Sequence, residues 1–177
     1  MRNPDTDAII LGLMSKQREI RGKKVFQKVC YFLQEAAGAQ MGLRFRMRHY
    51  GPYSEELDDR LEDLAERGLL VVDDLGDEGF RISAGANLQK ADLSAAPWER
   101  IDAVLADLAD EMGHGLRLEL LATAHFLSTT QPYRGSSEDK EQLIARVQAW
   151  KGKKFDAQFI SQNIERLKEL GYLPTSP

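Results

Sequence analysis

Apolar side chains recur every three or four residues along most of this chain, which is the spacing of one face of an α-helix. The pattern predicts helices over residues 5–16, 23–37, 54–67, 97–111, 116–128, 137–149 and 156–170. The segment 116–128 is apolar on almost every side, which is typical of a buried helix. Residues 17–22 are polar and are interpreted as a break between the first two helices.

A second pattern, with a period of two, covers residues 43–49 and predicts a strand with one buried and one cationic face. Gly51-Pro52 is expected to end this strand, and Ser54 to cap the helix that follows. Two β-prone runs, 69–73 and 79–83, flank a Gly/Asp-rich connection and predict a hairpin. The alternating residues are Leu43, Phe45, Met47 and His49 on the apolar face, and Arg44, Arg46 and Arg48 on the cationic face.

Together these elements predict a mainly α protein with a small β-hairpin. Residues 1–88 are expected to form a winged-helix-like N-terminal unit, and residues 97–173 a C-terminal helical unit packed on it. The small, polar segment 84–96 is interpreted as a linker, and one compact domain is the alternative. LEDLAERGLL at 61–70 resembles IERLKELGYL at 164–173. Two explanations of this similarity are equally good: two related helical subdomains, or the chance recurrence of a helix that ends at a glycine.

Charge is unevenly distributed along a chain whose formal net charge is −4. Residues 15–50 carry nine basic residues against Glu19 and Glu35, whereas residues 54–78 carry eleven acidic residues against Arg60 and Arg67. Such segregation can steer a partner electrostatically. The alternative is that the two blocks are neighbouring solvated faces that partly neutralise each other.

The residues are not arranged as a catalytic centre or a metal site requires. His49, His114 and His125 lack Cys, Asp or Glu at metal-binding spacing. Cys30, the single cysteine, lies in an apolar run where a thiol is inert, and no glycine-rich phosphate loop is present. We therefore expect no catalytic residues, no metal and no cofactor. A metal-dependent nuclease using the acidic block is a distant third hypothesis.

The single cysteine also rules out an internal disulfide, which fits a cytoplasmic location. No apolar run approaches the roughly 18 residues that span a bilayer, so no membrane association is expected.

Basic and aromatic residues around residues 23–53 form the best candidate surface for a protein partner or a nucleic acid. Lysines and arginines can grip phosphates, and tyrosines are favoured at interfaces. The helix 54–67 and the hairpin tip 73–78 are acidic, however, and would repel DNA. This repulsion favours a protein partner over DNA. The candidate residues are Lys23, Lys24, Lys28, Arg44, Arg46, Arg48, His49, Tyr50 and Tyr53.

The runs KVFQKVCYFLQEA, RFRMRHYGPYSEEL and LEDLAERGLL resemble small phage-associated proteins of bacteria and archaea, the YwgA-like proteins and the SocA-like (Panacea) antitoxin domain. The resemblance covers about residues 20–75, and the YwgA-like group is the closer match. It implies a helical, winged-helix-like fold without known catalysis and a role as antitoxin, toxin-binding adaptor or accessory protein of mobile elements. The matching positions are Lys24, Gln27, Lys28, Tyr31, Gln34, Tyr50, Gly51 and Pro52.

These arguments lead to a specific functional prediction. The chain is expected to be a non-enzymatic binding protein of the antitoxin or phage-defence type, acting through a protein partner such as a toxin or a phage protein. The alternative is a winged-helix DNA-binding transcriptional regulator that uses the basic patch.

Overall fold

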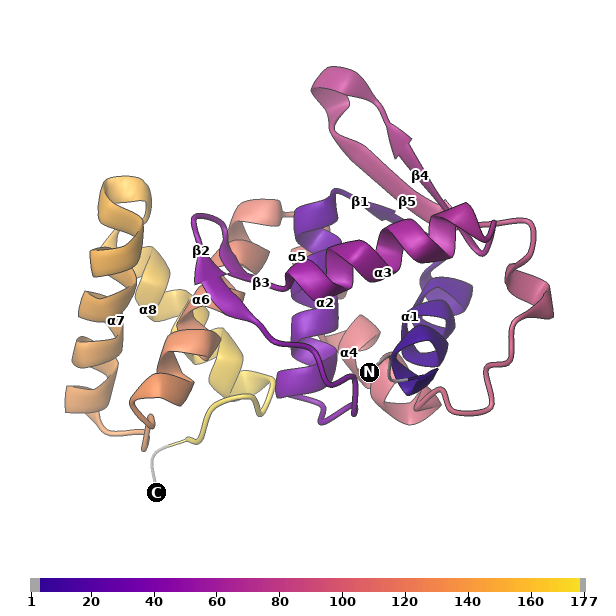
Figure 1. Ribbon diagram of the computed structural model, residues 1–177. Helices are drawn as coiled ribbons and strands as arrows, with labels where there is room; N and C mark the ends of the chain where they lie inside the picture. The colour runs from indigo at the N-terminus through magenta and orange to yellow at the C-terminus, as the bar shows by residue number, and fades with distance from the viewer. Residues whose placement is uncertain (1–3, 176–177) are drawn as a thin grey trace.

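The computed structural model describes residues 4–175, which fold into a helical body with one projecting hairpin (Figure 1). The α-helices are α1 (Pro4–Gln17), α2 (Lys23–Glu35), α3 (Glu55–Glu66), α4 (Trp98–Asp107), α5 (Ala109–Met112), α6 (Gly115–Thr130), α7 (Ser137–Lys151) and α8 (Ala157–Glu169). The strands are β1 (Glu19–Arg21), β2 (Arg46–Arg48), β3 (Gly51–Tyr53), β4 (Leu70–Asp74) and β5 (Phe80–Ala84). Single 3-10 turns form η1 (Gly76–Glu78), η2 (Leu88–Lys90) and η3 (Gly152–Lys154). The predicted fold class, mainly α with a small β-hairpin, is confirmed.

The hairpin β4–β5 is extended into a three-stranded antiparallel sheet by β1, in the order β1-β5-β4. The sequence analysis missed β1 and interpreted residues 17–22 as a polar break. A strand of three residues is too short to show an alternating pattern. Its central residue, Ile20, is buried opposite Ile82 of β5, and this one apolar contact places the strand.

The strand predicted over residues 43–49 is shorter than expected, and Gly51-Pro52 continues the ribbon instead of ending it. Residues 51–53 form β3, which pairs with β2 so that Met47 lies opposite Pro52. Proline is tolerated here because a two-stranded ribbon has free edges on which its missing N–H is not needed. The reversal therefore falls at His49 and Tyr50, and this turn carries the Tyr50 ring toward α2.

The helix predicted over residues 97–111 is broken into α4 and α5 at Leu108, and Pro97 precedes α4 instead of occupying its first turn. Ser54 caps α3 as expected, because its side chain accepts a hydrogen bond from the backbone N–H of Leu57. Gly68 follows the end of α3 and has a positive φ of 67°.

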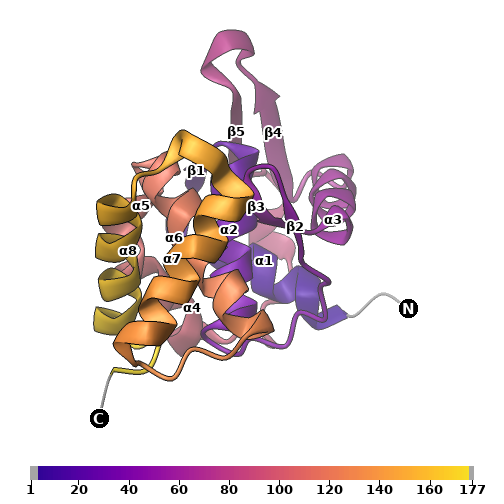
Figure 2. The ribbon, with the colours of Figure 1, turned by 90° about the vertical axis from the view of Figure 1, so that its left-hand side faces the viewer.

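Helix α6 occupies the centre of the body, between α2 on one side and α7 and α8 on the other (Figure 2). The residues from Leu118 to His125 are all buried, which confirms the apolar pattern read for this segment. The Nδ1 atom of His125 lies 2.7 Å from the Tyr31 hydroxyl oxygen of α2, and burial lowers the pKa of this histidine to about 4. His125 is therefore a neutral core residue at physiological pH.

One hydrophobic cluster includes residues from both halves of the chain, such as Phe32, Leu61, Leu121 and Ile164. The predicted division into units of residues 1–88 and 97–173 stays a prediction. Among the described helices, none is both long and apolar enough to cross a membrane.

Gly51 holds the β2–β3 ribbon against α6 by a close backbone approach. Its φ is +93°, and a Cβ atom there would lie 3.0 Å from the Thr123 Oγ1 atom and 3.3 Å from the Lys28 Cε atom. We expect Gly51→Ala to lower the free energy of unfolding by about 2–3 kcal/mol, measured by urea denaturation, because it adds crowding to the cost of a left-handed residue.

Gly76→Ala is the matched control, because Gly76 has a φ of +65° with no atom within 4 Å of the added Cβ. It carries only the cost of the left-handed backbone, about 1 kcal/mol. Equal losses in the free energy of unfolding of the two variants would contradict the close approach described for Gly51.

Candidate functional site

A pocket of about 600 Å³ lies where elements from both halves of the chain meet. Its walls come from the start of α2, the β2–β3 turn, the tip end of the projecting hairpin where β5 begins, the start of α6 and η3. The lining residues are Gly22, Lys23, Lys24, Val25, Lys28, Tyr50, Gly79, Phe80, Gly115, Leu116, Leu118, Glu119 and Lys154. Four lysines against one glutamate give this pocket a positive formal charge.

Two helix N-termini, those of α2 and α6, open at this pocket. Of the α-helices that the structure describes, these two have neither an acidic residue in the first turn nor a side-chain cap. The first N–H groups of a helix have no partner within it, and the helix dipole adds partial positive charge at the same end. An anion in the pocket would accept hydrogen bonds from the first N–H groups of both helices.

The pocket lysines are held in different ways. The Lys24 Nζ atom lies 3.1 Å from the centre of the Tyr50 ring, a cation–π contact. The Lys28 Nζ atom donates a hydrogen bond to the Pro52 carbonyl oxygen at 3.0 Å. Lys28 is only 3% exposed, and its burial lowers its pKa to about 8, although Glu119 opposes this shift.

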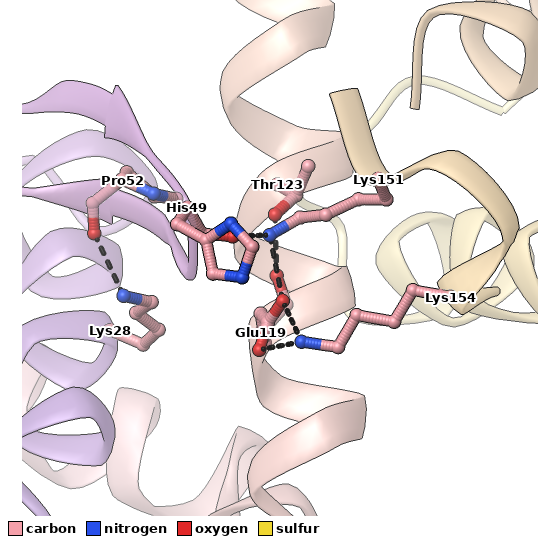
Figure 3. A network of polar contacts seen from close by, with 7 residues as sticks. All are labelled: Lys28, His49, Pro52, Glu119, Thr123, Lys151 and Lys154. Atoms are coloured by element: carbon pink, nitrogen blue, oxygen red, sulfur yellow. Dashed lines mark hydrogen bonds and ion pairs between the residues drawn. The ribbon is translucent and has the colours of Figure 1, made fainter. Parts of the chain in front are cut away.

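Glu119 of α6 is the centre of a buried polar network on the other side of the site (Figure 3). Lys151 donates to its Oε1 atom at 2.7 Å, and Lys154 donates to both carboxylate oxygens at 2.8 and 2.9 Å. Burial disfavours the carboxylate, but these hydrogen bonds outweigh it, so the pKa of Glu119 is lowered. Lys151 also donates to the His49 carbonyl oxygen at 2.6 Å and thereby ties the β2–β3 turn to α6 and α7.

Apolar side chains complete the walls and leave part of the surface open to a ligand. Leu116 is 58% exposed and Tyr50 is 42% exposed, although both are large hydrophobic residues. Val25 and Phe80 also line the pocket and are partly buried. Pockets for small molecules typically combine such apolar walls with a few fixed polar groups.

The predicted site residues are divided between two places in the fold. Lys23, Lys24, Lys28 and Tyr50 line the pocket, and His49 is exposed in the adjoining turn. The others, Arg44, Arg46, Arg48 and Tyr53, line a separate depression of about 100 Å³ with Glu55 and Glu56.

The two arginines at the ends of this cationic strand face are paired with the acidic helix. Arg44 bonds Glu56 at 2.8 Å, and Arg48 pairs with Glu55 at the start of α3. Lys23 also lies 3.9 Å from Asp58 of α3. These pairs favour the second interpretation of the segregated charge, in which neighbouring blocks partly neutralise each other.

Sequence reasoning missed the contribution of the second half of the chain. Glu119, Lys151 and Lys154 were not proposed, although residues 151–154 are strongly basic. The one sequence signal for Glu119 is that it is the sole carboxylate in the mostly apolar segment LRLELLATAHFL, residues 116–127. Among the described residues, no group of three or more His, Cys, Asp or Glu side chains could hold a metal ion.

Comparison with known proteins gives one significant relative. No family model matches the chain. A DNA ADP-ribosyl glycohydrolase from Thermus aquaticus is 34% identical to it over 151 residues, which cover 82% of this chain and 40% of that protein. The chain thus spans well under half the length of this relative.

This relative contradicts two predictions made from the sequence. One was a non-enzymatic binding protein of the antitoxin or phage-defence type, with a DNA-binding regulator as its alternative, and the other was the absence of enzymatic activity. Both are corrected, because the similar protein carries the name of a hydrolase that acts on modified DNA. The resemblance to YwgA-like and SocA-like proteins and the cytoplasmic location stay predictions.

Proposed function

We propose that this chain takes part in the removal of ADP-ribose from DNA, and that its lysine-lined pocket binds the ADP-ribosyl group. The named activity of the Thermus aquaticus relative supports the reaction. Because the chain spans 40% of that relative, the activity, the substrate and the DNA partner are all parts of the proposal.

The observation that carries the proposal is the convergence of two uncapped helix N-termini and four lysines in one pocket. ADP-ribose contains a pyrophosphate with two negative charges, flanked by two riboses and an adenine ring. Helix N-termini and lysines are the usual ligands of phosphate. A volume of about 600 Å³ is within the range of small-molecule sites, and the apolar walls offer contacts to the adenine and ribose groups.

Glu119 is the one carboxylate that lines the pocket. Glycosidic hydrolysis by paired carboxylates requires one that remains protonated to act as the acid. The pKa of Glu119 is lowered, so it is ionised at neutral pH and cannot supply that proton. Its role in this proposal is to fix Lys151 and Lys154 and to act as a negative charge beside the ribose.

The direction from which DNA approaches follows from the charges around the pocket. The exposed acids Asp74, Asp77 and Glu78 lie at the tip of the hairpin, which projects away from the body (Figure 1). They repel the phosphate backbone, as do the acids of α3. By contrast, Lys153 and Lys154 of η3 are exposed cations, and we expect the strand to lie there.

The proposed reaction is tested by incubating the purified chain with an oligonucleotide that carries ADP-ribose. Release of free ADP-ribose is followed by liquid chromatography, with the unmodified strand as the second product. The proposal predicts release that competes with added free ADP-ribose. Neither release nor binding of the modified oligonucleotide, in a chain shown to be folded, would contradict it.

Salt dependence gives a second check on the DNA contact. Because phosphate contacts release counterions, the affinity for the modified oligonucleotide should fall steeply with added salt. The affinity for free ADP-ribose should fall less, since it presents only the pyrophosphate. Equal slopes in fluorescence-anisotropy titrations from low to physiological salt would argue against an extended DNA contact.

A further inference from the structure

Trp150 is an exposed indole in the last turn of α7. It is 56% exposed, although it is one of the largest apolar side chains of the protein. The other tryptophan, Trp98, is less exposed, because its ring packs beside Gly12 of α1 and lies near the Lys16 ammonium group. Among the described residues, no ring or cation contact involves Trp150. Much of its ring is therefore open to a ligand.

The position of Trp150 along α7 places it on the side of the helix that faces the body. Leu143 and Val147, seven and three residues earlier, are fully buried, and these spacings share one face of a helix. Trp150 continues this stripe to the end of the helix, where the core stops. The next residue, Lys151, bonds the His49 carbonyl oxygen. The indole thus extends the inner face of α7 at the end of the helix that lies next to the β2–β3 turn (Figure 2).

Exposed lysines follow the indole directly along the chain. Gly152, with a φ of +58°, ends α7, and η3 then carries Lys153 and Lys154, which are both exposed. Lys154 lines the pocket, whereas Trp150 and Lys153 lie outside its lining. Four residues of chain span at most roughly 14 Å. The indole is therefore within reach of the nucleotides that adjoin a group bound in the pocket.

This combination of an open ring and cations is suited to a nucleic-acid strand. Residues 150–155 contain three lysines and no acid, so their charge is complementary to phosphates. Proteins hold strands with unpaired bases by placing lysines along the backbone and stacking bases on aromatic rings. Such stacking tolerates any sequence, because every base has a π-face.

We infer that Trp150 stacks on an unpaired base of the DNA beside the nucleotide that carries ADP-ribose, while Lys153 contacts a neighbouring phosphate. This inference rests on the proposed function, because it places the ADP-ribosyl group in the pocket. Trp150 is a positioning residue here, which holds the strand and touches neither the ADP-ribosyl group nor its bond to DNA. It contributes to the affinity for modified DNA and not to the affinity for free ADP-ribose.

The experiment measures the binding of free ADP-ribose and of a single-stranded oligonucleotide that carries it. Trp150→Ala should bind the oligonucleotide about tenfold more weakly, the effect of losing one stacked base, and free ADP-ribose as well as the wild-type chain does. Trp150→Phe should recover most of the loss, because it keeps an aromatic face. Trp98→Phe, at the packed tryptophan, is the control and should change neither affinity.

A duplex form of the same oligonucleotide separates stacking from a general contact with DNA. When the modified strand is annealed to its complement, its bases are paired and do not lie on the indole. Trp150→Ala should therefore bind the duplex as well as the wild-type chain does. An equal loss of affinity for the duplex and the single strand would overturn base stacking.

Tryptophan fluorescence reports the stacking directly, because the chain has two tryptophans. In Trp98→Phe the emission comes from Trp150 alone. The modified oligonucleotide should quench this emission, since a stacked base is in contact with the indole. Free ADP-ribose should leave it unchanged, since Trp150 lies outside the pocket lining.

The outcomes distinguish this inference from the proposed function. An unchanged affinity of Trp150→Ala for the single-stranded oligonucleotide, without quenching, would overturn the stacking and leave the proposed function standing. Equal losses of affinity for the oligonucleotide and for free ADP-ribose would also overturn it, because Trp150 would then act by supporting the pocket. Binding of neither ligand by the folded wild-type chain would remove the proposed function, and this inference with it.

Discussion

Replacing Lys24 and Lys154 together by glutamine will weaken the binding of ADP-ribose to this chain about 100-fold. The two Nζ atoms lie 3.1 and 5.1 Å from the centre of the Tyr50 ring, so both cations border the same wall of the pocket. A charge-assisted hydrogen bond to phosphate contributes about 1.5–3 kcal/mol. Taking the low end for partly solvated lysines, each substitution costs about a factor of ten.

The matched control changes the same amount of charge outside the pocket. Arg44→Gln with Arg48→Gln removes two cations that pair with Glu56 and Glu55 on the rim of the separate depression. Such exposed pairs contribute little to stability, and we expect binding to change less than threefold. Isothermal titration with ADP-ribose compares the wild-type chain and the two double variants. Equal losses of affinity in the two double variants would contradict binding in the pocket, because they would show that only the total charge of the chain matters.

Glu119→Gln will lower the free energy of unfolding by about 3 kcal/mol, the loss expected when one partner of a buried ion pair is removed. Glu119 is 7% and Lys151 is 2% exposed at the side chain, so the remaining ammonium group cannot regain its hydration. Lys151 would keep only its hydrogen bond to His49. The β2–β3 turn should loosen as a result, and the binding of ADP-ribose should weaken with it.

A double-mutant cycle isolates this interaction from the effect of the volume change. Lys151→Met and Glu119→Gln are measured singly and together by urea denaturation, and a coupling of 1 kcal/mol or more is expected. Glu138→Gln, at an exposed acid of α7, is the control and should change stability by less than 0.5 kcal/mol. Additive single effects would contradict a network centred on Glu119.

Acid provides an independent check on the same carboxylate. The folded pKa of Glu119 lies below its usual value of 4.5, so its contribution is complete above that pH and is lost as the pH falls through the lower folded value. The stability difference between the wild-type chain and Glu119→Gln should therefore shrink in acid.

Much of the helical architecture could be predicted from residue pattern alone. The apolar spacing places α2, α3, α6 and α8 within a few residues of their observed ends, because each buries a continuous stripe in the core. Strand β1 could not be predicted in this way, since it is positioned by one buried residue, Ile20, against β5. The same limit applies to the β2–β3 ribbon, where Pro52 contradicts the usual strand pattern.

Only half of the pocket was accessible to sequence reasoning. One half comes from neighbouring elements whose exposed faces can be predicted from the periodic pattern of the sequence. Its residues are Lys23, Lys24, Lys28 and Tyr50. Lys154 and Glu119 reach them only because α6 packs on α2 and α7 packs on α6. The alternating pattern of residues 43–49 shows a cationic face, but it does not show that Glu55 and Glu56 of the next helix pair with it.

The most direct test of the central claim is a crystal structure of this chain with ADP-ribose bound. The account predicts that the pyrophosphate lies between the first turns of α2 and α6, in contact with Lys24 and Lys154, with an apolar wall against the adenine. ADP-ribose bound at the arginine depression beside α3, or at any place away from these two helix N-termini, would contradict it.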